Sequence, residues 1–489
     1  MEDIVQSKAN IFLSWFLLFL LITLIETPYL KIPYSANEGM FTHVAQEMRY
    51  GSKLYQDVWD HKPPLLFLPF VIIQDIFGTA ELPIRLFAVF LHFLDTLILF
   101  SLVQRFDLGY KTAWFTICSY VCLLFPPYFQ TWTPQAELLM QPFLLGSFLL
   151  AYSGGVAAWI GAGILWALAF FIKPTALFFI PLFLFLIGRE KLKPALFFIL
   201  GADSIALTVV APFILDGRLP LFGQALWAAN QSYVSEGWHY FLDHPFYELH
   251  VLSWHGTIAL AYGIPLILSL FFVLKQAWGK NQKFNREYVF VTTWLLLAIL
   301  SCFISGYFHP YYYFMVIPPL AIVFGSFLES SRKIKKGLAV SVSIISVFFL
   351  LLPWLRVCKE GVSGIKNSEY FQDRSNEAKE IGLYLCEKAL PENRLMVWAS
   401  EAQIYTYSGL KMAVVKSALG TNSLATPELW NGLKDIFIKI PPDYVVISRF
   451  DQLPIPPSWL SEEIENNYTK ERRWDHYDLF VRLMPKYQH

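Results

Sequence analysis

The sequence is poor in charge and in cysteine for a chain of its length. Only 16% of its 489 residues are charged, whereas a soluble globular protein has about 25%. Because 55% of the residues are hydrophobic, a single aqueous core could not bury them all. Five cysteines exclude a disulfide scaffold, and equal numbers of basic and acidic residues leave no net charge to attract nucleic acid. The composition therefore indicates a polytopic membrane protein.

Long apolar runs recur through residues 1–356, which we expect to form a helical transmembrane domain of about eleven spans. A helix that crosses a bilayer needs roughly 20 apolar residues. The expected spans are 11–30, 82–104, 111–128, 137–152, 156–172, 174–188, 194–215, 252–274, 288–307, 311–328 and 337–355. Only ten residues precede the first run and no small-residue cleavage site follows it, which predicts an uncleaved anchor.

One further apolar stretch, residues 63–78, is expected not to cross the membrane. If residues 63–78 do not cross, fourteen Lys and Arg residues in the loops and the N-terminal segment lie on the same side as the N-terminus, and six lie on the opposite side. Cytoplasmic loops are enriched in Lys and Arg. We therefore predict a protein of the cell inner (plasma) membrane with its N-terminus in the cytoplasm, its C-terminus outside, and residues 63–78 as a helix in the outer interface.

From residue 357 the chain becomes much more polar. We expect residues 357–489 to form a small α/β domain on the exoplasmic or periplasmic side. Residues 373–390 have the apolar spacing of an amphipathic helix. Residues 395–398, 444–448 and 479–483 have the composition of short strands.

Glu38 is the first candidate catalytic residue, in the predicted outer loop 31–81. The apolar residues between Met40 and Met48 share one helical face, which predicts a short amphipathic helix on the membrane surface. Ser35 and Glu38 have the spacing of a helix capping box. A carboxylate at the boundary of water and lipid is also a candidate general base. The residues alone leave both interpretations open.

Lys62 is the candidate cation of the same loop. It follows Asp60 and His61 and precedes two prolines, so it cannot lie in the middle of a helix. A lysine at this depth can extend to the phosphate of any membrane lipid. Alternatively, it is a fixed cation for the phosphate of a lipid-linked substrate.

Further candidates lie where later spans begin or end. Glu137 opens a span, where the helix dipole alone favours a carboxylate, but it could also position a hydroxyl group or a metal. Lys173 lies between two apolar runs, and His309 and Tyr312 stand at the start of another. Tyrosine at such a position also fits an aromatic belt.

Three of the ionisable residues inside the predicted spans are further candidates: His92, Asp95 and Asp203. Such residues are functional candidates, although hydrogen bonds between helices explain them equally well. The sequence contains no Cys/His spacing for a metal and no phosphate loop. No cofactor is certain, and a divalent metal held by Glu38 and Glu137 stays an alternative.

The order of these motifs carries a family resemblance. The motifs are Asn37-Glu38, Lys62-Pro-Pro-Leu65, Phe77-Gly78 with Arg85, Thr133-Pro-Gln-Ala-Glu137, Phe171-Ile-Lys-Pro174 and the run from His309 to Pro319. Over about residues 11–330 the chain resembles the C-type glycosyltransferases that use polyprenyl-phosphate sugars. This group includes bacterial relatives of protein O-mannosyltransferases and the aminoarabinose transferase of lipid A. The tail resembles the outer domain that many members carry.

The resemblance implies a function and a set of roles. A sugar would pass from a polyprenyl-phosphate donor to a hydroxyl group of a glycan, lipid or protein acceptor on the outer face, with inversion. Glu38 and Glu137 would be the catalytic carboxylates. The implied substrate contacts are Lys62, Asp60, His61, Arg85, Lys173, His309 and Tyr312. Many members have Asp where this chain has Asn37, which weakens the case for a metal pair.

Three other functions stay open. A transporter or lipid flippase would have ionisable residues near the bilayer midplane on repeated helices. A polysaccharide polymerase or ligase would have Arg and His in a large outer loop, and loop 216–251 has Arg218, His239, His244 and His250. A non-catalytic scaffold would have no need of carboxylates gathered at one membrane boundary.

Overall fold

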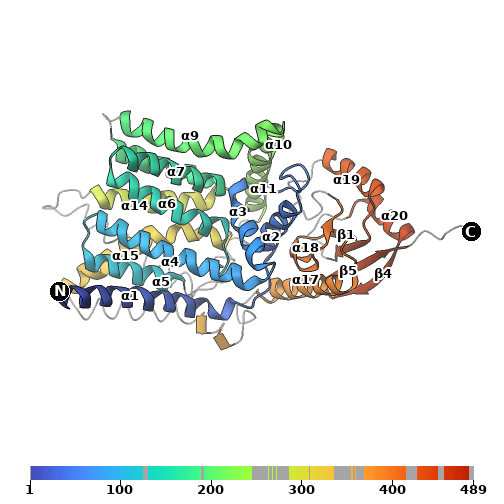
Figure 1. The fold of residues 1–489 in the computed structure, drawn as a ribbon, viewed down its shortest axis with the longest axis horizontal. Coiled ribbons are helices and arrows are strands. Elements are labelled where there is room, and N and C mark those ends of the chain that lie inside the picture. Colours follow the sequence, from blue (N-terminus) through green and yellow to red (C-terminus); the bar gives the residue numbers. More distant parts are fainter. Residues whose placement is uncertain are drawn as a thin grey trace, which may run out of the picture. The chain divides into compact units, whose positions relative to one another are not determined.

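The computed structural model describes residues 2–124, 130–188, 192–244, 286–307, 309–334, 368–414, 427–449 and 456–483, with a few isolated residues between 263 and 359. These residues form many helices and one five-stranded sheet (Figure 1). The chain divides into two compact units. The first comprises residues 1–31, 84–211 and 237–365, and the second comprises 32–83, 212–236 and 366–489. The predicted spans 252–274 and 337–355 lie outside the described residues.

The first unit is built from apolar helices. Its elements, some of which extend into the second unit, are α1 (Glu2–Glu26), η1 (Thr27–Tyr29), α4 (Glu81–Arg105), α5 (Tyr110–Leu124), α6 (Ala136–Ser153), α7 (Val156–Ile172), η4 (Pro174–Phe179), α8 (Ile180–Ile187), α9 (Leu192–Leu215), α14 (Arg286–Phe303), η6 (Pro310–Val316) and α15 (Ile317–Ile334). Neighbours pack closely: a Cβ atom on Gly163 would lie 1.9 Å from the carbonyl oxygen of Phe198. Such close contact through small residues is typical of helices packed in membranes.

Six helices of the described residues are long and apolar enough to cross a bilayer. They are Asn10–Tyr29, Glu81–Arg105, Ala136–Ser153, Leu192–Leu215, Arg286–Phe303 and Pro310–Ser330. Each coincides with a predicted span. The described residues of the predicted spans 111–128, 156–172 and 174–188 also form helices, which are shorter within the described ranges. The exact number of spans therefore stays a prediction.

The second unit contains three segments that are distant in sequence. Its elements before the tail are α2 (Ala36–Arg49), η2 (Pro64–Leu66), α3 (Leu68–Phe77), α10 (Leu219–Gly223), the π-helix η5 (Gln224–Ala228) and α11 (Ala229–Asp243), the last shared with the first unit. The helical stretch Pro64–Phe77 would cover only about 21 Å at 1.5 Å per residue, less than a bilayer's hydrocarbon core. Because the predicted span 174–188 contains a helical stretch of the same length, Pro174–Ile187, the placement of residues 63–78 outside the hydrocarbon core stays a prediction.

The tail forms a mixed sheet with helices. Its elements are α17 (Ser368–Lys388), β1 (Arg394–Trp398), α18 (Gln403–Ser408), β2 (Lys411–Met412), α19 (Pro427–Lys439), β3 (Tyr444–Ser448), α20 (Ser458–Asn467), β4 (Tyr468–Arg473) and β5 (Tyr477–Arg482). The strand order is β2-β1-β3-β5-β4, with β1 parallel to β2 and β3, and β5 antiparallel to β3 and β4. The near-continuous burial of β1 and β3 indicates that both faces are covered.

The predicted elements of the tail are confirmed. Residues 373–390, expected to be helical, lie largely in α17, and the three expected strands coincide with β1, β3 and β5. Met396, Val445 and Phe437 belong to one buried core with α20. The predicted domain boundary after residue 356 stays a prediction, since the unit that holds the tail also holds segments 32–83 and 212–236.

Candidate functional site

Glu38 lies in the first turn of α2 and is fully buried. The hydroxyl oxygen of Ser35 accepts a hydrogen bond from the Glu38 N–H at 3.4 Å. In return, Glu38 Oε2 accepts one from the Ser35 N–H at 3.0 Å. The capping box expected from the Ser-x-x-Glu spacing is therefore confirmed. It fixes the direction of the carboxylate, which is also what a catalytic base requires.

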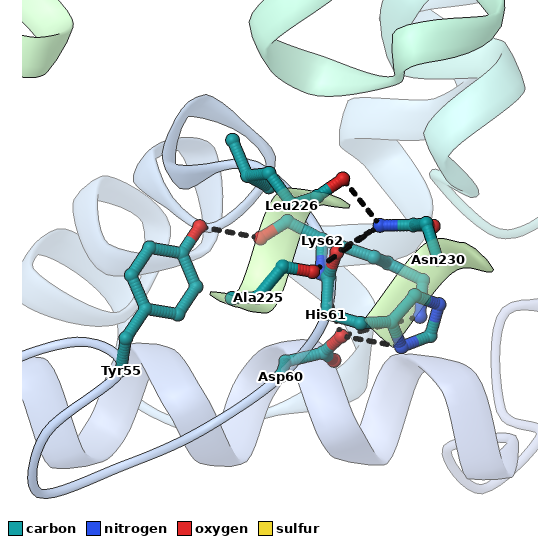
Figure 2. A network of polar contacts seen from close by, with 7 residues as sticks. All are labelled: Tyr55, Asp60, His61, Lys62, Ala225, Leu226 and Asn230. Carbon is teal, nitrogen blue, oxygen red and sulfur yellow. Dashed lines mark hydrogen bonds and ion pairs between the residues drawn. The ribbon is translucent and has the colours of Figure 1, made fainter. Parts of the chain in front are cut away.

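Lys62 is held on several sides (Figure 2). Its carbonyl oxygen accepts a hydrogen bond from the Tyr55 hydroxyl at 2.7 Å, and its N–H donates to Asp60 Oδ1 at 3.0 Å. The ammonium group lies 3.5 Å from the same Asp60 oxygen and 5.3 Å from the centroid of the Phe41 ring. Because Phe41 follows Glu38 by three residues in α2, the candidate cation lies beside the helix that carries the candidate base.

Asn230 links the Lys62 loop to the π-helix η5 (Figure 2). Its side-chain amide donates to the carbonyl oxygens of His61 at 3.0 Å, Leu226 at 3.1 Å and Ala225 at 3.3 Å. A π-turn contains an extra residue and is often found at functional sites. The His61 ring lies 3.3 Å from Asp60 Oδ1 and stacks on Tyr233. The loop is thus fixed by a segment more than 160 residues further along the chain.

The sequence analysis did not identify Asn230 as part of a site. In the sequence this residue attracts notice mainly as the first residue of an Asn-Gln-Ser glycosylation pattern, whereas its amide donates to three carbonyl groups. An additional sequence signal is that asparagine has a low helix propensity. Its occurrence inside a helical stretch calls for a specific hydrogen bond.

A second group of predicted residues comes together in the first unit. Lys173 and Glu137 form a direct ion pair, and the Lys173 ammonium group lies 4.2 Å from the centroid of the Tyr312 ring. The His309 ring meets Tyr312 edge-on at 5.3 Å. Lys173 adopts an extended conformation directly after α7, as the following proline requires. Four residues predicted from separate motifs therefore lie in one cluster.

A small pocket of about 170 Å³ empty volume lies beside this cluster. Its lining is mostly polar and comes from the motif that precedes α6 and from η6. The lining residues are Gln130, Thr131, Thr133, Gln135, Glu137, Leu138, Tyr311 and Phe314. The space is too narrow to hold a water molecule in this structure, so these side chains mark a surface near Glu137 rather than a formed ligand site.

The ionisable residues inside the spans make structural hydrogen bonds. His92 Nε2 lies 2.8 Å from the carbonyl oxygen of Thr131, and Asp95 Oδ2 accepts from Gln141 at 2.7 Å and from Tyr120 at 3.0 Å. For these two residues the structural interpretation is therefore the simpler one. Asp203 instead has an exposed side chain on α9.

Arg85 lies in α4 and is buried. Its charge interacts with the carboxylate of Glu26, a residue that the sequence analysis passed over. Glu26 also accepts a hydrogen bond from the Thr131 hydroxyl at 3.2 Å. An acidic residue in an apolar run is a signal that could have identified it.

The described residues contain no group of side chains arranged as metal ligands. No three His, Cys, Asp or Glu side chains in the described ranges are placed to hold an ion together. Glu38 takes part in the capping box, and Glu137 is paired with Lys173. Both carboxylates of the metal alternative therefore already have other partners.

Comparisons with known proteins show a partial family match and a shared fold. Residues 61–215 match the model of the family described as dolichyl-phosphate-mannose-protein mannosyltransferase. The structure of ArnT from Cupriavidus metallidurans bound to undecaprenyl phosphate is similar, with a TM-score of 0.59 and 14% sequence identity over 96% of this chain and 98% of that one. Its apo state gives the same values. No curated protein matches the chain.

A second fold relative is the oligosaccharyltransferase AglB from Archaeoglobus fulgidus, in complex with an inhibitory peptide and a dolichol-phosphate. It has a TM-score of 0.51 and 13% identity over 89% of this chain and 69% of that one. The family match over residues 61–215 and the shared fold together indicate a glycosyltransferase. The long apolar helices of the described residues indicate a multi-pass membrane protein.

Proposed function

We propose that the protein transfers a sugar from a polyprenyl-phosphate donor to an acceptor hydroxyl group on the outer face of the plasma membrane, in one inverting displacement. The observation that carries this proposal is the fixed placement of Lys62 beside α2, the helix whose first turn carries Glu38. Two of the structures with this fold contain a polyprenyl phosphate or a dolichol-phosphate, which supports a donor of that class.

The reaction needs a base and a cation, and Glu38 and Lys62 supply them. Glu38 removes the proton of the acceptor hydroxyl as its oxygen attacks the anomeric carbon. The bond between that carbon and the phosphate oxygen breaks, and its electron pair leaves with the polyprenyl phosphate. One capping bond ends on the Glu38 carboxylate, and a carboxylate offers about four acceptor positions.

Lys62 stabilises the negative charge that grows on the departing phosphate. Among the described residues its ammonium group is paired with one carboxylate, that of Asp60 at 3.5 Å, and its side chain is 26% exposed. Asp60 and His61 act through Lys62. Asp60 Oδ1 accepts the Lys62 N–H and also lies 3.3 Å from the His61 ring. A phosphate group can therefore become the main partner of this cation.

The other predicted contacts belong to the same proposal. Glu137 orients substrate hydroxyl groups, while its ion pair with Lys173 holds this carboxylate in place. His309 and Tyr312 offer aromatic faces, on which sugar rings commonly pack. Arg85 is proposed as a substrate contact on the family resemblance alone.

A donor panel tests the function. The purified protein is given polyprenyl phosphates that carry different hexoses and pentoses, together with nucleotide sugars and lipid-free sugar phosphates, in the presence of a lipid and glycan extract. We expect release of polyprenyl phosphate, measured by mass spectrometry, with at least one lipid-linked donor and none with the lipid-free controls. Turnover of nucleotide sugars alone, or of no donor, would contradict the proposal.

The proposed orientation is tested separately by labelling. In a variant without the five native cysteines, a cysteine that replaces the exposed Lys53 is expected to react with a membrane-impermeant reagent in intact cells. A cysteine that replaces Lys335 is expected to stay unlabelled. The opposite pattern would place the reaction on the cytoplasmic side.

A further inference from the structure

The tail packs directly against the helix that carries Glu38. In the second unit, α18 lies on the face of α2 that bears Gly39 and Thr42. A Cβ atom on Gly39 would lie 2.3 Å from Gln403 Oε1 and 2.7 Å from its backbone nitrogen, so glycine is required there. The hydroxyl oxygens of Thr42 and Thr406, 364 positions apart, are 3.1 Å from each other.

Tyr407, at the end of this contact, has a hydroxyl group with two partners. It accepts a hydrogen bond from the Tyr34 N–H at 2.9 Å and donates one to Glu81 Oε1 at 2.9 Å. Its ring also stacks on the Tyr34 ring at 5.4 Å, and only 9% of the residue is exposed. Burial and the Glu81 carboxylate raise the pKa of the Tyr407 hydroxyl, so it stays protonated and can make both bonds.

Tyr34, whose N–H is bonded to Tyr407, comes immediately before the capping box. Tyr34 is followed by Ser35, whose N–H and hydroxyl group are both bonded to Glu38. The N–H groups of Tyr34, Ser35 and Glu38 are therefore each bonded to a side chain, and the first of these side chains comes from the tail. Tyr34 and Ser35 are joined by one peptide bond, and the Ser35 N–H is bonded to the Glu38 carboxylate. A displacement of Tyr34 would therefore shift Ser35 and with it the Glu38 carboxylate.

We propose that Tyr407 is a positioning residue for Glu38, so that the tail helps to assemble the catalytic centre. This inference rests on the proposed role of Glu38 as the base. Tyr407 touches neither donor nor acceptor in this account. It acts on the rate of the chemical step by fixing the backbone from Tyr34 to Glu38.

The test variant is Tyr407→Phe in the full-length protein, which keeps the ring and removes only the hydroxyl group. We expect faster hydrogen–deuterium exchange in the peptide that covers residues 34–38. With the fastest donor of the panel, we expect kcat to fall roughly 10- to 100-fold, because small misplacements of a catalytic group have effects of this size. The donor KM should stay within about twofold, since Lys62 is not displaced.

The matched control is Tyr50→Phe. The Tyr50 hydroxyl also bonds the tail, through the carbonyl oxygen of Gly409 at 3.2 Å, but at the other end of α2. This variant should leave both kcat and the exchange of residues 34–38 unchanged. Equal effects of the two variants would overturn the proposal in favour of a general loosening of the tail.

A double variant separates this proposal from the assignment of the base. If Tyr407 acts through Glu38, adding Tyr407→Phe to Glu38→Gln causes no further loss of the residual rate. A further loss of 10-fold or more would contradict the positioning role. Full activity of Glu38→Gln itself would overturn the assigned base, whereas an inactive Glu38→Gln with a fully active Tyr407→Phe would overturn only the inference about Tyr407.

Discussion

The two candidate lysines differ in how far a carboxylate compensates their charge. Lys173 pairs directly with Glu137, and both groups are largely buried. Lys62 is 3.5 Å from Asp60, and the same Asp60 oxygen also accepts the Lys62 N–H and lies near the His61 ring. Among the described residues, Asp60 Oδ1 therefore has several partners, whereas Glu137 Oε1 pairs with Lys173. The difference suggests that Lys62 is the cation that can accept a phosphate, and that Lys173 serves mainly to hold Glu137.

The largest effect should come from breaking the tighter pair. Lys173→Met leaves the buried Glu137 carboxylate without its cation, and removal of one partner of a buried pair costs about 3–5 kcal/mol of stability. The double variant Lys173→Met/Glu137→Gln should recover most of the loss. Thermal unfolding of the purified variants measures the stability lost in the single variant and recovered in the double variant. Equal stability of the single variant and the native protein would show that the pair is not important for folding.

The next effect concerns donor binding. Lys62→Ala removes a hydrogen bond to a charged phosphate, worth about 1.5–3 kcal/mol, and should raise the donor KM roughly 10- to 100-fold. Lys53→Ala is a control in the same loop, because its exposed ion pair with Asp216 is not expected to contribute to binding. The donor KM of each variant is measured with the panel assay. An unchanged KM for Lys62→Ala would contradict the phosphate role.

A smaller effect depends on pH and involves only the second unit. Burial lowers the pKa of His43 from 6.5 to about 3. Its ring stacks on Tyr405, and neither ring nitrogen has a hydrogen-bond partner among the described residues. The unfolded chain binds a proton at His43 below pH 6.5, whereas the folded chain does so only near pH 3. Stability should therefore fall as the pH decreases through this window, by about 2 kcal/mol between pH 7 and pH 5.

The variant His43→Phe tests this pH dependence. Phenylalanine keeps a flat ring against Tyr405 but cannot bind a proton. The stability of the variant, measured by thermal unfolding at both pH values, should therefore change less on acidification than that of the native protein. An identical pH dependence in both proteins would show that His43 does not titrate in this way.

The smallest effect should come from the frame around Lys62. Asn230→Ala removes the amide that bonds His61 and the π-helix, and a neutral hydrogen bond contributes about 0.5–1.5 kcal/mol. We expect a roughly 2- to 10-fold increase in donor KM with little change in kcat. A control is Asn467→Ala, whose amide bonds Glu463 on an exposed helix surface. Equal KM values for the two variants would argue against a role for Asn230.

Local patterns were sufficient to predict much of the fold. The apolar runs gave the membrane helices, the spacing of Ser35 and Glu38 gave the cap of α2, and the composition of the tail gave three of its strands. These features depend on residues that are close in sequence. A helical period or a capping pair is visible without knowledge of the tertiary structure.

The second buried face of α2 could not be predicted in this way. The apolar residues from Met40 to Met48 indicate one buried face, but Thr42, His43 and Gln46 on another face are buried as well. They contact α18, more than 350 residues away, through small and polar side chains that produce no apolar period. The same reason explains why Asn230 and Tyr407 were missed: each acts through hydrogen bonds to a distant backbone group.

The central claim is that Glu38 removes the acceptor proton while Lys62 holds the donor phosphate. Its most direct test is Glu38→Gln, which keeps the shape of the side chain and removes its basicity. With the fastest donor of the panel, the variant should bind the donor with the affinity of the native protein but release polyprenyl phosphate about 10²- to 10⁴-fold more slowly, the contribution typical of a general base. Release at the native rate would contradict the account.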